Sequence, residues 1–318
     1  MTPLRPYAAG RPGVGVAMVL AAGTLFAVNG TAAKLILQSG LDAQQLTLLR
    51  AVGAAAGLLV VAAALPSARL RLSAREVPML IAYGLTGFFL VPMLYFVAIA
   101  RIPVSIGLLF EFTAPLFVAV WARFGQGQRV RPRLWVGLGL CLLGLAGVAN
   151  IGGDLRLDVI GVAAALTCAV LLAAYYVLGA HSVRNRDAVS LTGWAFTVSA
   201  LAGLAYRLVV GVGDWSALGG TAKGLPVWLL AAYLVIFGSI VPYCLVAAAM
   251  RHLPATSVGI IGMIEPVVAG AFAWVTLGEK LTPAQLAGGA VLLAGVGLAE
   301  TARIAKPVPE QVRESVHA

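Results

Sequence analysis

The chain has 318 residues, 61% of them hydrophobic and 11% charged, and its formal net charge is +10. Soluble domains are usually about half apolar and about a quarter charged, so this composition excludes an ordinary water-soluble protein. The basic residues stand singly or in short clusters between apolar stretches, which argues against a nucleic-acid-binding face and is typical of the loops of a membrane protein.

Ten apolar segments follow one another along the chain. A helix that crosses the hydrocarbon core of a bilayer needs roughly 20 mostly apolar residues, and the segments are of about that length. The sequence therefore predicts an all-α polytopic membrane protein with ten transmembrane helices. In chain order the segments are residues 14–37, 44–65, 77–100, 103–124, 133–150, 157–180, 188–206, 227–249, 254–276 and 283–301.

Charges in the connecting segments predict the orientation of these helices. If the N-terminus lies inside, most Lys and Arg residues outside the spans fall on the inner side, as the positive-inside rule requires. Both termini are therefore predicted to be cytoplasmic, and residues 1–13 form a cytoplasmic N-terminal segment. The polar, proline-interrupted stretch at 304–318 is predicted to be a disordered cytoplasmic tail.

The second half of the chain repeats the first. Three pairs of segments align, at offsets of 151, 150 and 146 residues: IPVSIGLLFEFTAP (102–115) with LPATSVGIIGMIEP (253–266), LVPMLYFVAIAR (90–101) with IVPYCLVAAAMR (240–251), and GVA (15–17) with GVA (161–163). Each unit holds five predicted helices, and an odd number makes the second unit enter the membrane from the opposite side. Two inverted repeats are therefore predicted, at 14–150 and 157–301. Secondary transporters share this architecture and bind substrate near the midplane between the repeats.

Among the twelve acidic residues, Glu111 and Glu265 fall well inside predicted spans. An ionisable group near the middle of a ~30 Å hydrocarbon core costs at least a few kcal/mol, so each should face a cavity or a partner. Pro115 and Pro266 cannot donate a helix hydrogen bond, so both helices should kink at equivalent depth, next to a site for a cation or an amine. The alternative is a satisfied kink beside a neutral, hydrogen-bonded glutamic acid.

Arg50 is the basic residue that lies clearly within a predicted span. It could receive a substrate carboxylate through paired hydrogen bonds. The alternatives are that it reaches out to the lipid headgroups or pairs with a carboxylate such as that of Glu111. The remaining candidates are polar or aromatic residues inside predicted helices: Asn29, Tyr95, Tyr175, Tyr176, Trp194 and Tyr243. Aromatic residues in membrane helices more often pack or face lipid than contact a ligand.

Several motifs are missing from the sequence. It contains no GxxxxGK[ST], HExxH, GxSxG or CxxC, and Cys141, Cys168 and Cys244 each stand alone inside an apolar segment. Direct ATP drive, a catalytic site and a metal site are therefore not expected, and no cofactor is predicted.

Three stretches carry a resemblance to a known family: EFTAP (111–115), VPY (241–243) and MIEPVVAGAFAWVTLGEKLTPAQLAGG (263–289). They resemble the EamA type of the drug/metabolite transporter superfamily, and most closely its threonine/homoserine exporter branch. The resemblance covers nearly the whole chain as two EamA units. It implies an inner-membrane, proton-coupled exporter of amino acids or related metabolites, in which Glu111 and Glu265 are the site carboxylates. Ala114 stands where the repeat has Glu265, so a symmetric two-carboxylate mechanism is not expected.

The sequence thus predicts a secondary exporter that works by alternating access. Glu265 would bind a proton or an amine, Glu111 would be a second cavity carboxylate, and Arg50 would receive a carboxylate. The expected partners are a small-molecule substrate and membrane lipid, without nucleic acid, and no oligomeric state is predicted. Two alternatives stay open: export of a drug, nucleobase or sugar derivative, and a passive channel. A membrane-embedded enzyme is disfavoured by the missing motifs.

Overall fold

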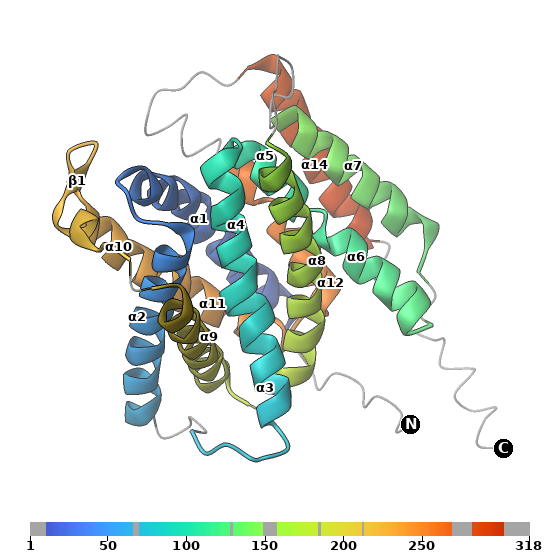
Figure 1. Ribbon diagram of the computed structural model, residues 1–318. Coiled ribbons are helices and arrows are strands. Elements are labelled where there is room, and N and C mark those ends of the chain that lie inside the picture. The colour runs from blue at the N-terminus through green and yellow to red at the C-terminus, as the bar shows by residue number, and fades with distance from the viewer. Residues whose placement is uncertain are drawn as a thin grey trace.

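The computed structural model describes residues 11–65, 70–127, 130–148, 158–183, 186–211, 213–268 and 282–301. The predicted tail at 304–318, most of the predicted N-terminal segment 1–13 and the end of the ninth predicted span lie outside the described residues. Within them the chain is almost entirely helical, and the helices pack into one bundle (Figure 1). A short antiparallel hairpin, β1 (Thr221–Ala222) with β2 (Leu225–Pro226), projects beside α10 at one edge.

The helices of both halves follow the predicted spans. In the first half they are α1 (Pro12–Gln38), α2 (Ala43–Ala64), α3 (Val77–Gly84), η1 (Leu85–Leu90), α4 (Val91–Arg101), α5 (Val104–Glu111), α6 (Ala114–Val120), η2 (Trp121–Gly125) and α7 (Pro132–Val148). In the second half they are α8 (Val159–Ser182), α9 (Ala188–Val210), η3 (Ser216–Gly219), α10 (Val227–Val235), η4 (Ile236–Ile240), α11 (Val241–Ala249), α12 (Ala255–Gly262) and α14 (Pro283–Thr301).

Eight helices among the described residues are long and apolar enough to cross a membrane, judged by length and composition. They include the composite helices Val77–Arg101 and Val227–Ala249. Two shorter apolar helices, Pro132–Val148 and Ala255–Val268, occupy the other two predicted positions. The prediction of a polytopic helical membrane protein is confirmed, and the chain is a multi-pass membrane protein.

The composite helices α3–η1–α4 and α10–η4–α11 each contain a π-helical segment, and in each a Val-Pro pair follows it (91–92 and 241–242). The N–H of Val91 and that of Val241 bond to the carbonyl five residues earlier. Proline favours this change at η1 and η4 because it supplies no N–H and crowds the preceding turn. The carbonyl of Phe88, which Pro92 leaves without its helix donor, accepts the hydroxyl of Ser199 at 2.8 Å.

Two further helices are interrupted at equivalent points. A two-residue turn, 112–113, separates α5 from α6, and a turn at 263–264 separates α12 from a helical segment at 265–268. The turns are 151 residues apart, the offset of the repeat. Pro115 and Pro266 each stand second in the helical segment after the turn, where a missing N–H leaves no hydrogen bond unmade. Half-helices of this kind present backbone ends inside a membrane protein.

The pair α7 and α14 packs side by side (Figure 1) at glycines, with very close backbones. A Cβ on Gly144 would meet the backbone of Leu292, and a Cβ on Gly295 would meet the backbone of Cys141. Gly144 and Gly295, like Cys141 and Leu292, are 151 residues apart, so each helix makes the same contact with the other. Since rising numbers in α7 meet falling numbers in α14, the two helices run antiparallel. An approximate two-fold axis therefore passes between them.

One end of the bundle carries the α2–α3, α8–α9 and α11–α12 loops, and polar contacts join these loops. Arg186, whose side chain is 4% exposed, donates to the carbonyl of Arg71 at 2.6 Å and to Glu76 at 3.0 Å. Arg251 donates to the carbonyl of Arg186 at 2.5 Å. We name this end, defined by Arg71, Glu76, Arg186 and Arg251, the Arg186 end. Its contacts join the first half of the chain to the second.

The opposite end also joins the two halves. Asp42 caps α2 by accepting the N–H of Gln45 at 2.6 Å, and it forms an ion pair with Arg207 of α9. Gln45 in turn donates to the carbonyl of Asp214 at 2.7 Å. Both ends of the bundle are therefore held by contacts between residues far apart in the chain.

Candidate functional site

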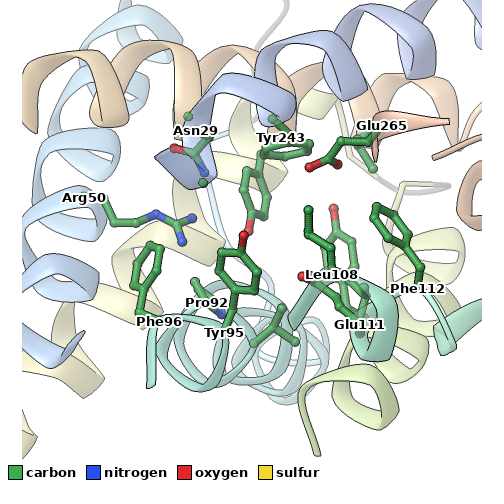
Figure 2. Close-up of a pocket in the computed structure, with 18 of the residues that line it drawn as sticks. Asn29, Arg50, Pro92, Tyr95, Phe96, Leu108, Glu111, Phe112, Tyr243 and Glu265 are labelled. Carbon is green, nitrogen blue, oxygen red and sulfur yellow. The ribbon is translucent and has the colours of Figure 1, made fainter. Parts of the chain in front are cut away.

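A cavity of about 100 Å³ lies inside the bundle, between the first and second halves of the chain (Figure 2). Its walls come from α1, α2, η1, α4, α5, α8, η4 and α11, together with Glu265. An apolar cavity of about 150 Å³ can hold benzene, so this volume suits a small metabolite. Of the residues singled out from the sequence, the cavity brings together Asn29, Arg50, Tyr95, Glu111, Tyr175, Tyr176, Tyr243 and Glu265.

Arg50 reaches the cavity from α2, and its side chain is buried, with 3% exposed. Its Nε donates to the hydroxyl of Ser239 in η4 at 2.9 Å. The guanidinium carbon lies 5.5 Å from the ring centre of Phe196 and 5.2 Å from that of Tyr243, which are cation–π distances. The Nη2 atom has no hydrogen-bond partner among the described residues. Arg50 therefore points inward instead of reaching out to the headgroups.

The two carboxylates stand on the other side of the cavity from Arg50 (Figure 2). Glu111 is the last residue of α5, before the turn, whereas Glu265 begins the helical segment after the equivalent turn. Both side chains line the cavity on the same side of it (Figure 2). The cavity is therefore polarised, with a cation on one wall and two acids on the opposite wall.

Aromatic rings separate the charged groups and form a second wall. The ring centre of Tyr243 lies 4.7 Å from that of Phe88 and 5.5 Å from that of Phe26. Tyr175 stacks on Tyr83 at 5.2 Å. These rings belong to the largest buried cluster and fix the positions of the tyrosines at the cavity. Pairs in such edge-on or stacked arrangements contribute about 0.5–1.5 kcal/mol each beyond the area that they bury.

Two of the π segments, η1 and η4, each bring one glycine to the cavity, and each of these glycines admits a side chain from the other half of the chain. A Cβ on Gly238 would overlap Oδ1 of Asn29, and a Cβ on Gly87 would overlap the ring of Tyr175. Asn29 and Tyr175 are 146 residues apart, the offset of the GVA repeat. The two halves therefore make the same contact with different chemistry, an amide in one and a phenol in the other.

Trp194 does not line the cavity. Its Nε1 donates to the carbonyl of Leu70 at 3.2 Å, close to the Arg186 end, so its observed contact holds a loop in place. Conversely, Ser239, Phe196 and the two π-segment glycines were not singled out from the sequence. Ser239 is the one serine or threonine in the predicted span 227–249, but serine is ordinary in apolar helices, so its signal is weak. Among the described residues no group of three or more His, Cys, Asp or Glu side chains could hold a metal ion.

Comparisons with known proteins bear on the family and the fold of the chain. The model of the EamA-like transporter family matches residues 13–150 and 159–301. An uncharacterized transporter of Archaeoglobus fulgidus is 29% identical over 68% of this chain and 74% of its own length. The threonine/homoserine exporter RhtA of Escherichia coli K12 is 29% identical over 68% of this chain and 70% of its own. A solved crystal structure covers 91% of this chain and 97% of its own with a TM-score of 0.71; at 19% identity it shows the fold alone.

Proposed function

The chain belongs to the EamA-like transporter family of the drug/metabolite transporter superfamily, and from that premise we propose that it exports a small amino acid of the threonine or homoserine type. The observation that carries this proposal is the polarised cavity, with Arg50 on one wall and Glu111 and Glu265 on the other. An amino acid bears a carboxylate and an ammonium group, so the opposed charges of the cavity complement the two charges of the substrate.

The size of the cavity and the named relatives support the same substrate class. Pockets for drug-sized ligands usually occupy about 300–1,000 Å³, and this cavity has about 100 Å³. That difference disfavours a large drug. The relatives that carry a substrate in their name are called threonine/homoserine exporters.

Alternating access is the mechanism that we propose, with ten transmembrane helices in two inverted repeats, 14–150 and 157–301. The antiparallel, reciprocal contact of α7 with α14 supports the inversion, because a two-fold axis in the membrane plane would generate it. In this arrangement both termini lie in the cytoplasm and the protein resides in the cytoplasmic membrane. The contacts at each end of the bundle would then open in turn on either side of the cavity.

Proton coupling follows from the chemistry of a buried carboxylate. Glu265 can hold an ammonium group or a proton, but one excludes the other. Protonation from the outer side would release the amine of the substrate there, and loss of the proton to the cytoplasm would restore the site. Glu111 would supply a second acceptor in the same cavity. The result is an exchange of substrate against protons.

The test uses proteoliposomes loaded with labelled L-threonine or L-homoserine under an imposed pH gradient. Wild-type protein should show saturable, gradient-driven flux, and Glu265→Gln should lower it at least about tenfold, because the amide can neither release a proton nor balance an ammonium charge. Glu300→Gln is the matched control, since Glu300 bonds to Ser257 at 2.9 Å and does not line the cavity. Unchanged flux in Glu265→Gln would refute the role of that residue, and flux without saturation would indicate a channel.

A further inference from the structure

The π segment η4 binds the guanidinium group of Arg50 through its Nε atom. The Nε of Arg50 donates to Ser239 at 2.9 Å, and the hydroxyl of Ser239 donates to the carbonyl of Leu234 at 2.9 Å. The serine hydroxyl therefore donates its one proton to the backbone carbonyl of Leu234 and accepts a hydrogen bond from Arg50. Because Ser239 is 0% exposed, water does not compete for either bond.

The rings of Phe196 and Tyr243 flank the same guanidinium and limit its rotation. With Nε used by Ser239, the edge that remains is the one formed by the two Nη atoms, and Nη2 has no partner among the described residues. A buried donor without an acceptor is costly, and more so when it is charged. The protein thus keeps a donor at one specific edge of a cation, Nη2, unsatisfied inside the cavity.

The serine occurs in η4 and not at the equivalent position of η1. Aligned on their glycines, η1 (LTGFFL) and η4 (IFGSI) place Phe88 opposite Ser239. The first half therefore has a ring where the second has the hydroxyl. Gly238, next to Ser239, packs on Asn29, so consecutive residues of η4 position the two polar side chains on this wall of the cavity.

We infer that Ser239 is a positioning residue that selects which edge of Arg50 meets the substrate, and that it thereby makes the cavity specific for ligands bearing a carboxylate. Paired hydrogen bonds from the two Nη atoms match the two oxygens of a carboxylate, whereas an amide offers one oxygen and repels with its NH₂. This inference rests on the proposed function, because it assigns Arg50 to the carboxylate of the transported amino acid.

The experiment measures counterflow of labelled L-threonine in proteoliposomes and its inhibition by L-threonine and by L-threoninamide, which lacks the carboxylate. Wild-type protein should prefer the acid over the amide at least about tenfold, as expected for charge-assisted bonds. In Ser239→Ala we expect KM for L-threonine to rise about three- to tenfold, kcat to change less than about twofold, and the preference for the acid to fall in parallel.

Ser199→Ala is the matched control. Ser199 is equally buried, and its hydroxyl donates to the carbonyl of Phe88 in the other π segment instead of contacting Arg50. It should keep the preference of the wild type. In an Arg50→Gln background, Ser239→Ala should change the preference no further, because the two residues act as one unit.

Two results would overturn the inference: an undiminished preference in Ser239→Ala, or an equal loss of preference in Ser199→Ala. A different result identifies failure of the proposed function itself. If wild-type protein catalyses no saturable counterflow of L-threonine or L-homoserine, amino-acid export is wrong and the assignment of Ser239 falls with it.

Discussion

At the scale of single residues, Gly238 shows how closely the cavity wall is fitted. Its Cα lies against the amide of Asn29, and any side chain at 238 would occupy the same space. Asn29 comes from α1 and Gly238 from η4, so this contact also fixes the distance between the two halves beside Arg50. A glycine is required here by close approach and not by backbone conformation, because Gly238 is not among the glycines with positive φ.

We expect Gly238→Ala to lower transport at least about tenfold, because the added Cβ would displace Asn29 into the cavity. Overpacking of this kind usually costs about 1–3 kcal/mol. The measurement is counterflow, together with the thermal midpoint of the purified protein. Gly139→Ala is the control, since a Cβ at Gly139 has no neighbour within 4 Å. Wild-type transport in Gly238→Ala would mean that Asn29 does not depend on this contact.

At this scale, charged residues were easier to predict from the sequence than the residues that support them. Glu111, Glu265 and Arg50 were detectable because ionisable groups are costly inside a membrane and therefore rare there. Ser239 and Phe196 could not be weighted in the same way, since serine and phenylalanine are ordinary in apolar helices. Their place beside Arg50 depends on how α2, α9 and η4 pack, and no local pattern encodes that packing.

At the scale of elements, the crossing of α7 and α14 depends on glycines at one face of each helix. A Cβ on Gly295 would lie 2.6 Å from the backbone nitrogen of Cys141, and a backbone cannot move aside as a flexible side chain can. Gly297 lies two residues further along the same helix, and a Cβ there would have no neighbour within 4 Å.

Gly295→Ala should therefore lower the thermal midpoint in detergent, with a cost of about 1–3 kcal/mol from the separation of the two helices. Gly297→Ala should leave the midpoint unchanged or raise it, because alanine favours a helix by about 1 kcal/mol over glycine. Differential scanning fluorimetry of the two variants compares them directly. Equal midpoints would show that the crossing tolerates a wider spacing.

The elements themselves were predictable in position but not in detail. The apolar segments located the helices, and Pro115 and Pro266 marked two of the places where they depart from regular geometry. The π segments before Pro92 and Pro242 were not predicted. The sequence did not distinguish a π segment from an interruption. At the interruptions the proline stands in the first turn of a new helical segment, where no hydrogen bond is lost, whereas at η1 the hydroxyl of Ser199 donates to the carbonyl that Pro92 leaves free.

At the scale of the whole molecule, the polar contacts of the Arg186 end join the two halves of the chain. Cys244 of α11 is half-buried next to Thr192, near the start of α9, and can report on opening there. Cys141 and Cys168 are fully buried and supply an internal standard.

We expect Arg186→Gln to increase the rate at which a thiol reagent modifies Cys244, because Glu76 and the carbonyl of Arg71 lose their shared donor. A loss of about 1.4 kcal/mol from the closed arrangement would raise the open fraction tenfold. Arg101→Gln serves as the control, since Arg101 pairs with Asp158 at the opposite end, with both side chains more than 40% exposed. An unchanged rate in Arg186→Gln would exclude this end as a gate.

The polytopic membrane class was predictable from composition, and the two halves from the repeated prolines and glycines. Of the cavity itself, the sequence predicted only that the ionisable residues inside the membrane would face a cavity or a partner. The placement of Arg50 on one wall and the two glutamates on the other depends on contacts between residues that are 100 or more positions apart in the chain, such as Arg50 and Ser239.

The reciprocal contact of α7 with α14 has a consequence for biosynthesis. Since the facing glycines are repeated in the two helices, α7 presents a surface similar to that of α14, and we expect the α7 of a second chain to fit it as well. While a nascent chain is still being inserted, α7 exists before α14 does, and neighbouring ribosomes display identical copies of it. We therefore expect two processes to compete during synthesis: packing of α14 on α7 of the same chain, and pairing of α7 between two incompletely synthesised chains. Slower translation of the second half would favour the mispaired product.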